Sequence, residues 1–251
     1  MPDRLHHLDL AEGDVGRYAL LPGDPARVPV LASFLEDAKE VASKREYTTW
    51  AGRLDGELVA VTSTGIGCPS AAIAVEELAT IGVDTVVRVG TAGGMQRETL
   101  PGDLVVASAA IRDEGTSRQY LPSEFPAVAD LDVTTALRAA LTEADIRHHV
   151  GIVHSKDSFY GQREPERMPV AAELTARWSA WKAGGALCSE MEAAAIFVVA
   201  TTRGLRAGGL MLVAGNQELS NAEPARDEEH IAALAGAAIA GLRKLIARDR
   251  P

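Results

Sequence analysis

Apolar positions along the chain fall into two alternating patterns. Short runs of strand length are almost continuously apolar, and longer segments between them carry apolar residues at helical spacing. The short runs predict strands at Tyr18–Leu21, Leu58–Thr62, Thr85–Val89, Leu104–Ala109, Gly151–His154 and Gly208–Val213. The longer segments predict helices at Pro25–Leu35, Pro69–Ile81, Leu131–Glu143, Val170–Lys182, Glu190–Arg203 and Asp227–Arg248.

This alternation of strands and helices indicates an α/β fold. Strands that lack a polar face are typical of a sheet covered by helices on both sides. The chain has 251 residues, of which 47% are hydrophobic and 24% charged, and we expect one domain over residues 1–251. Ligands of such sheets bind in a crevice beyond the carboxyl ends of the strands, so polar residues at strand ends are the first candidates for chemistry.

Composition excludes several classes of function. The net charge is −10, which argues against nucleic acid or an anionic membrane as a partner. The polar start MPDRLHHLDL is unlike a signal peptide, and no run of ~18 uncharged apolar residues occurs, so we expect a cytoplasmic protein. The two cysteines, Cys68 and Cys188, lack the spacing of a disulfide framework or a zinc site.

The first predicted strand ends in a motif that suits an anion. Asp24 can cap a helix and Pro25 can start it, while Gly23 lets the backbone approach a ligand beside Arg27. Gly-Asp-Pro is also a common helix start, which by itself is the simpler interpretation.

Arg88 is the one charged residue in the apolar strand Thr85–Gly90. A buried guanidinium without a partner costs several kcal/mol, so Arg88 needs either an acid or a bound anion. It lies two residues before the strand end, next to a glycine-rich turn and the Thr91 hydroxyl, and we favour the anion. The sequence contains neither a dinucleotide fingerprint nor a P-loop.

The segment Lys44–Trp50 is the densest polar and aromatic cluster. On its own it is typical of an exposed hairpin edge. Together with Arg27 and Arg88, however, Arg45 is a third candidate anion ligand in an acidic protein, and three such residues favour phosphate.

Two later segments suit a sugar and a flat ring. Ser189 and Glu192 precede an apolar run as a capping box, in which Glu192 accepts from the Ser189 amide. Alternatively, Glu190 and Glu192 are about 200° apart on a helix, so one carboxylate can accept two adjacent sugar hydroxyls while the other points away. In Ser155–Gln162, an aromatic side chain can stack on a ring and an amide can pair with its edge.

Six motifs in this order resemble the nucleoside phosphorylase-I family, and most closely its uridine phosphorylases. They are Leu21–Val28, Arg45–Trp50, Ser63–Ser70, Arg88–Gly93, Ser155–Gln162 and Ser189–Glu192. The resemblance runs from about His7 to the final helix. It implies a single three-layer α/β/α domain with a central mixed, partly barrel-like sheet, assembled as a homo-oligomer, a hexamer built of dimers.

The resemblance also implies a reaction. Inorganic phosphate attacks C1′ of a nucleoside, here uridine, with inversion, and gives ribose 1-phosphate and free base in nucleoside catabolism and salvage. No metal or organic cofactor is required. In some uridine phosphorylases a potassium ion lies between subunits, and the matching positions are Glu46, Ile66 and Ser70, which can supply oxygen ligands.

Site residues follow from the resemblance position by position. The phosphate site comprises Gly23, Arg27, Arg88 and Thr91, with Arg45 from the neighbouring subunit. The ribose site comprises Met191, Glu192 and the neighbour's His7. The base site comprises Phe159 and Gln162. The residues expected to act in catalysis are Arg88, Gln162 and Glu192.

Two departures from the family pattern concern the base. The segment Phe159–Arg163 is one residue shorter than Phe-Tyr-Pro-Gly-Gln-x-Arg. Residues 214–218 lack both the Arg of pyrimidine enzymes and the Ser-Asp pair of hexameric purine enzymes. We expect Gln162 with Arg163 or Lys156 to bind the uracil oxygens.

Three alternatives stay open at this point. A purine nucleoside phosphorylase could use Asn216 against a purine edge. A nucleosidase would use water, and would have no use for three phosphate ligands. A non-catalytic nucleoside-binding protein would not need the intact set of Arg and Glu residues.

Overall fold

The computed structural model describes residues 4–219 and 223–250. The strands are β1 (Tyr18–Pro22), β2 (Glu36–Lys44), β3 (Tyr47–Leu54), β4 (Glu57–Thr62), β5 (Thr85–Gly94), β6 (Leu104–Asp113), β7 (Ala127–Val128), β8 (His148–Lys156), β9 (Cys188–Glu190) and β10 (Arg206–Asn216). The α-helices are α1 (Val28–Ala32), α2 (Cys68–Thr80), α3 (Leu131–Glu143), α4 (Phe159–Arg163), α5 (Ala171–Ala183), α6 (Ala193–Arg203) and α7 (Glu228–Asp249).

The sheet is mixed and partly closed. Its strand order is β10-β6-β8-β9-β5-β1-β4-β3-β2, and an additional pairing of β10 with β5 joins five of these strands into a ring. β1 pairs in parallel with β4 and β5, whereas β6 runs antiparallel to β10. The expectation of a mixed, partly barrel-like sheet is confirmed.

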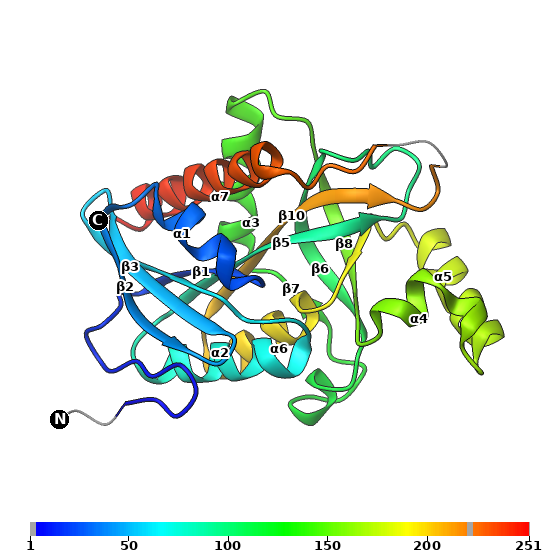
Figure 1. Ribbon diagram of the computed structural model, residues 1–251, viewed down its shortest axis with the longest axis horizontal. Helices are drawn as coiled ribbons and strands as arrows, with labels where there is room; N and C mark the ends of the chain where they lie inside the picture. The colour runs from blue at the N-terminus through cyan, green and yellow to red at the C-terminus, as the bar shows by residue number, and fades with distance from the viewer. Residues whose placement is uncertain (1–3, 220–222, 251) are drawn as a thin grey trace.

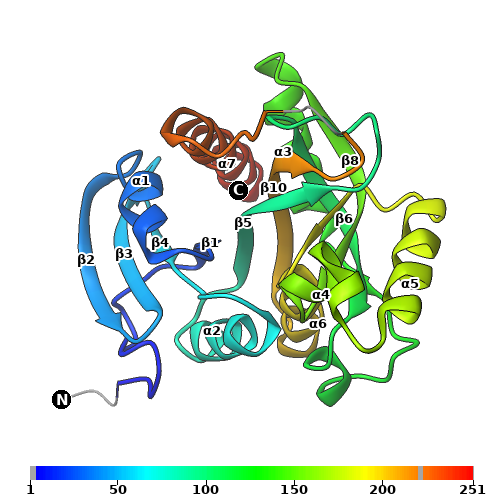
Figure 2. The ribbon, with the colours of Figure 1, turned by 45° about the vertical axis from the view of Figure 1, so that its right-hand side comes forward.

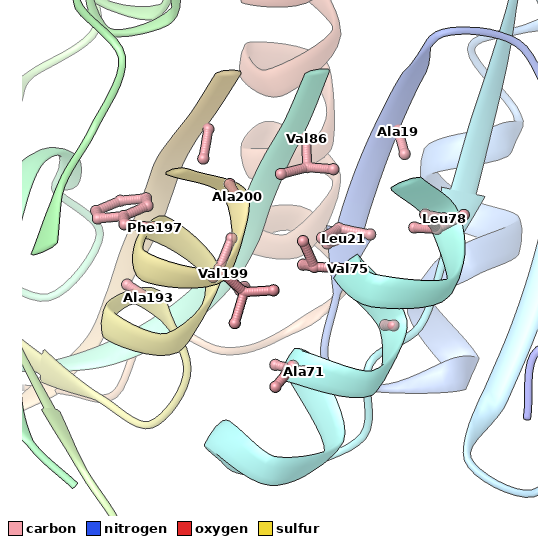
Figure 3. Close-up of a cluster of buried hydrophobic side chains, with 14 of the residues drawn as sticks. Ala19, Leu21, Ala71, Val75, Leu78, Val86, Ala193, Phe197, Val199 and Ala200 are labelled. Carbon is pink, nitrogen blue, oxygen red and sulfur yellow. The ribbon is translucent and has the colours of Figure 1, made fainter. Parts of the chain in front are cut away.

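Helices cover the sheet on two sides (Figures 1 and 2). α2 and α6 lie side by side on one face, and α1, α3 and α7 lie on the other. Figure 3 shows Val75 of α2 and Val199 of α6 directed toward each other and toward the strand residues Leu21 and Val86. These four side chains are buried in one apolar core, and a second core lies under α3 and α7.

α7 is long and apolar enough to cross a membrane by length and composition. Its apolar residues are nevertheless used inside the fold. Leu234, Ile239, Leu242 and Leu245 are buried in the second core, where α7 packs against α3. α7 is therefore a core helix of this fold.

Two predicted boundaries are wrong near the candidate site. The helix predicted from Glu190 begins at Ala193, because residues 188–190 form β9, which pairs with both β5 and β8. The segment after β8 is not only loop. Ser158 accepts from the Gly161 amide at 2.9 Å and thereby caps the short helix α4.

Candidate active site

Residues from three segments form a cluster where the carboxyl ends of β1 and β4 meet β5. Gly23 follows β1, Gly65 follows β4, and Arg88 lies on β5. A methyl group on Gly23 would lie 3.2 Å from the Gly65 carbonyl oxygen and 3.3 Å from Arg88 Nη1. The fold thus brings together three segments that are far apart in the sequence, at the edge where α/β proteins bind ligands.

Arg88 has an acid partner. Its Nη2 donates to Glu192 Oε2 at 2.5 Å, and both residues are 4% exposed. The acid partner, which the sequence ranked second to an anion, is therefore present and offsets the cost of burying the guanidinium. Arg88 Nε is buried without a hydrogen-bond partner, so the guanidinium keeps unused donor capacity.

The two carboxylates of the Ser189–Glu192 segment have different partners. Glu192 accepts from Arg88 and, through Oε1, from the Gly67 amide at 2.7 Å. Glu190 instead accepts from the amides of Glu192 and Ala193 at 2.8 and 3.0 Å. The predicted capping box is thus wrong, since Glu190 satisfies the start of α6. The carboxylates do have different partners, but the predicted helix geometry is not the reason, because Glu190 lies in β9 and α6 begins at Ala193. Burial, with the nearby Glu192 charge, raises the pKa of Glu190.

Arg27 adds a second cation to the cluster. Asp24 caps the short helical turn Pro25–Arg27 by accepting from the Ala26 amide at 2.9 Å, as the sequence predicted. Burial lowers the pKa of Arg27, and the positive charge of Arg88 lowers it further. Two guanidinium groups close enough to repel each other create a positive potential that attracts an anion.

The Arg88 guanidinium packs directly against Gly90, where there is no room for a side chain. A methyl group at Gly90 would lie 2.8 Å from Arg88 Cζ, closer than nonbonded atoms approach. Thr91 lies further along β5 and is partly exposed. Gly90 lies in β5, as predicted, and its missing side chain makes room for the arginine. The glycine-rich turn predicted after it is wrong, because Thr91–Gly94 continue β5.

A pocket of about 480 Å³ opens at the carboxyl end of β8. Lys156, Gln162 and Arg163 line it, as does Gln217, which the sequence did not identify as a site residue. Gln162 Nε2 donates to Gln217 Oε1 at 2.6 Å. Gln217 directly follows β10, so the rule that ligands bind at strand ends could have identified it.

Lys156 is the buried cation of this pocket. It is 6% exposed, and its Nζ donates to Ser189 Oγ at 2.8 Å. Burial lowers its pKa, which the carboxylates of Glu190 and Glu192 partly oppose. Arg163 is exposed, and its guanidinium lies 5.9 Å from the Phe159 ring centre. Of the two cations expected near the base, Lys156 is the one fixed in place.

Asn216 does not face the pocket opening. Its Nδ2 donates to the carbonyls of Gln96 and Thr99 at 2.7 and 2.8 Å, and its Oδ1 accepts from the Glu218 amide at 2.8 Å. The side chain thus holds the backbone of two loops together. Its expected alternative role as a purine contact does not fit this arrangement.

The potassium candidates come from different segments: Glu46 lies at the tip of the β2–β3 hairpin, Ile66 follows β4, and Ser70 lies in α2. Ser70 Oγ donates to Glu46 Oε1 at 3.1 Å, and Ile66 is 79% exposed. Arg45 lies at the same tip with φ +56°, exposed and without an ion-pair partner within residues 4–219 and 223–250. The hairpin predicted for this segment is confirmed, and its tip carries several polar groups.

His7 lies at the opposite end of α2 from the cluster. Its Nδ1 is 2.6 Å from Glu77 Oε1. Gly67, which contacts Glu192, precedes α2, and the helix separates Gly67 from Glu77 by about 15 Å at 1.5 Å per residue. His7 is therefore remote from the Arg88–Glu192 pair of its own chain.

Comparison with known proteins gives consistent matches. The family model of the Phosphorylase superfamily matches residues 17–247. The uridine phosphorylase of Treponema pallidum (strain Nichols) is 51% identical over 212 residues, 84% of this chain and 82% of that protein. The uridine phosphorylase of Escherichia coli (strain K12) is 41% identical, over 89% of this chain and 91% of that protein. The guanosine phosphorylase of Halorubrum lacusprofundi is 42% identical, over 90% and 89%.

Proposed function

This chain belongs to the phosphorylase superfamily, and on that premise we propose that it catalyses the reversible phosphorolysis of uridine to uracil and ribose 1-phosphate. It is an enzyme of the pentosyltransferase class. The observation that supports the reaction best is the buried Arg88–Glu192 pair, with its 2.5 Å hydrogen bond, beside Arg27 and Gly23 at the strand ends.

The cluster suits both reactants of the displacement, inorganic phosphate and the ribose of the nucleoside. Arg27 and Arg88 attract the phosphate dianion and hold it in position for attack on C1′. Each carboxylate oxygen has two lone pairs, so Glu192 can accept ribose hydroxyls while it keeps its bonds to Arg88 and Gly67. Arg88 thereby links the carboxylate that binds the sugar to the site that binds phosphate.

The pocket at the end of β8 suits the departing base. Negative charge develops on the uracil ring as the bond to C1′ breaks, and a preorganised cation or donor stabilises it. Lys156 supplies a buried ammonium and Gln162 an amide. Phe159 is exposed next to Arg163, which lines the pocket, and can stack on the ring. The chemistry of these side chains requires no metal or organic cofactor.

Guanosine phosphorolysis is the second candidate. It is favoured by the Halorubrum lacusprofundi relative, which is as similar to this chain as some uridine phosphorylases are. Uracil and guanine both present an N–H beside a carbonyl oxygen, and one glutamine amide can pair with either. The position of Asn216 removes the residue that the sequence offered as a purine contact.

The decisive experiment is a panel of nucleosides assayed with and without inorganic phosphate. We expect uridine to be cleaved only with phosphate, with ribose 1-phosphate as product. Cleavage in water alone would indicate a nucleosidase, and binding without turnover of any nucleoside would indicate a binding protein.

We propose that the active unit is at least a dimer, within a hexamer built of dimers. Arg45 lies at an exposed hairpin tip, and His7 is about 15 Å along α2 from its own Glu192 contact. Lys44 Nζ donates to the His6 carbonyl at 2.7 Å, so the hairpin tip and the N-terminal segment form one surface. Both residues are thus presented together for a neighbour's site.

Mixing two inactive variants should restore activity if sites are shared. In a dimer of Arg45→Ala and Glu192→Gln chains, one site is intact and the other carries both changes. Dissociation and random reassembly should therefore recover about a quarter of wild-type activity. A mixture of Arg45→Ala with His7→Ala is the control, because both residues come from the same chain and neither site becomes intact. Equal activity of the two mixtures would refute a shared site.

We also propose that a potassium ion binds where Glu46 and Ser70 meet at the hairpin tip. The carboxylate and hydroxyl are adjacent and offer the oxygen ligands that such an ion needs, and Ser70 Oγ also bonds to the Thr64 carbonyl. Ile66 would contribute its carbonyl. This is tested by measuring the midpoint of thermal unfolding in potassium chloride and in choline chloride, both for wild type and for Glu46→Gln.

A further inference from the structure

A continuous row of polar side chains leads away from Lys156 into the protein. It passes from Lys156 to Ser189, then to His154, and ends at Asp113. The four residues come from three neighbouring strands. His154 and Ser189 are paired in register between β8 and β9, and Asp113 is paired with Lys156 between β6 and β8.

The distances in this row are those of hydrogen bonds. Lys156 Nζ lies 2.8 Å from Ser189 Oγ, which lies 3.0 Å from His154 Nδ1. His154 Nε2 lies 3.0 Å from Asp113 Oδ2. Asp113 also forms an ion pair with Arg177 of α5, so the far end of the row is anchored to a helix.

Hydrogen-bond chemistry allows only one direction along the row. An ammonium donates and cannot accept, so Ser189 Oγ accepts from Lys156. At the other end, the Asp113 carboxylate only accepts, so His154 Nε2 carries a hydrogen and donates to it. In a neutral ring Nδ1 then has no hydrogen and accepts the hydroxyl hydrogen of Ser189. Burial, together with the Lys156 charge, lowers the pKa of His154 to about 3, consistent with a neutral ring.

Lys156 itself is incompletely satisfied. An ammonium has three donors, and beyond Ser189 its remaining contact is the Glu190 carbonyl at 3.5 Å. It has no ion-pair partner within the part of the chain that the structure describes. A buried ammonium lining a pocket without a counter-ion is ready to receive an anion. In the proposed reaction the anion that forms there is the departing base.

We propose that His154, supported by Asp113, is a positioning residue for this reaction. It orients the Ser189 hydroxyl as an acceptor for Lys156, and so holds the Lys156 ammonium against the departing base. The row does not deliver a proton, because a neutral His154 has no hydrogen on the nitrogen that faces Ser189. This inference rests on the proposed phosphorolysis and assigns His154 and Asp113 a part in it.

The test compares two substrates with different leaving bases. Fluorine at C5 withdraws electrons from uracil, so 5-fluorouridine depends less on the ammonium than uridine does. We expect His154→Phe, which keeps a ring and removes both nitrogens, to lower kcat for uridine by up to about 100-fold. The loss for 5-fluorouridine should be smaller by about fivefold or more. Ser189→Ala should give the same split.

A matched control exists on the same strand. His149 of β8 contacts Asp103 with Nε2 at 2.9 Å from Oδ2, but lies outside the pocket. His149→Phe should leave the ratio of the two kcat values at the wild-type level. The ratio is measured within one preparation, so it is unaffected if a variant folds only in part. Equal losses for both substrates in His154→Phe would overturn the positioning role.

Failure of the function itself gives a different result. If wild type does not cleave uridine with phosphate, the phosphorolysis proposal fails before any variant is compared. If wild type is active and Lys156→Gln changes neither kcat nor the substrate ratio, the inference fails and Lys156 is removed from the base site, while phosphorolysis stands. The phosphate KM of His154→Phe should equal that of wild type, because the row does not contact Arg27 or Arg88.

Discussion

Replacing Arg88 by alanine should lower kcat/KM for phosphate by roughly 10³-fold, the scale on which loss of a preorganised donor to a developing charge reduces catalysis. The guanidinium is buried against Glu192 at 2.5 Å and is crowded by the charge of Arg27. Its removal takes away a phosphate ligand and the partner that orients Glu192, the carboxylate proposed to bind ribose. Steady-state kinetics with phosphate varied at saturating uridine measure the effect.

The same substitution should also reduce stability. It leaves Glu192 buried, 4% exposed, without its counter-ion, and breaking such a pair costs on the order of 3–5 kcal/mol. A thermal melt of each variant therefore has to accompany the kinetics. Protein that is folded at the assay temperature and still lacks activity shows that the loss arises in the site and not from unfolding.

Gly90→Ala separates the chemical effect from the loss of charge. Its methyl group would displace the Arg88 guanidinium, which lies 2.8 Å away, while the ion pair with Glu192 keeps its members. We expect a raised phosphate KM in a folded protein. Gly236→Ala is the control, since its nearest neighbour, Phe34, would be 3.7 Å away in ordinary contact. Near-normal kcat/KM for phosphate in Arg88→Ala would refute the phosphate assignment.

Uridine should be preferred over inosine and adenosine, and Gln162→Ala should remove most of the preference over adenosine. A site built to hydrogen-bond one edge of a base rejects other bases by up to ~10⁴-fold, because its buried polar groups would be left unpaired. The measurement is kcat/KM for uridine, thymidine, inosine, guanosine and adenosine at saturating phosphate, for wild type and for Gln162→Ala.

The structure gives a reason why Gln162 can discriminate. Its Nε2 donates to Gln217 Oε1, and Gln217 Nε2 donates to the Arg163 carbonyl at 3.3 Å. This orientation leaves Gln162 Oε1 as an acceptor for the N3–H of uracil, with a second Nε2 hydrogen for a neighbouring carbonyl oxygen. Adenine offers no ring N–H at that edge, so it would leave the acceptor unpaired.

Gln217→Ala is the companion variant. It keeps Gln162 but frees its amide to rotate, so discrimination against adenosine should fall by less than in Gln162→Ala. If inosine, guanosine or adenosine is the best substrate of wild type, the preference for pyrimidines is wrong and phosphorolysis stands. Unchanged ranking and rates in Gln162→Ala would remove the residue from base recognition.

Much of the architecture follows from local sequence. The predicted helix Leu131–Glu143 has the bounds of α3, and six apolar runs coincide with strands, because apolar periodicity reports directly on burial. β2 gave no such signal. Its residues are mostly exposed at the sheet edge, so no apolar pattern marks Glu36–Lys44 as a strand.

The sequence by itself also identified Arg88, since a single charge in an apolar strand is a local feature with a known energetic cost. Only the tertiary structure decided its partner, because Glu192 is distant in sequence and β9 places Glu190 on the helix amides instead. The same holds for the row from Lys156 to Asp113, which depends on the register of three strands. Residue type limits what a side chain can bind, but which group it does bind depends on distances of about 3 Å between strands that only the folded sheet brings together.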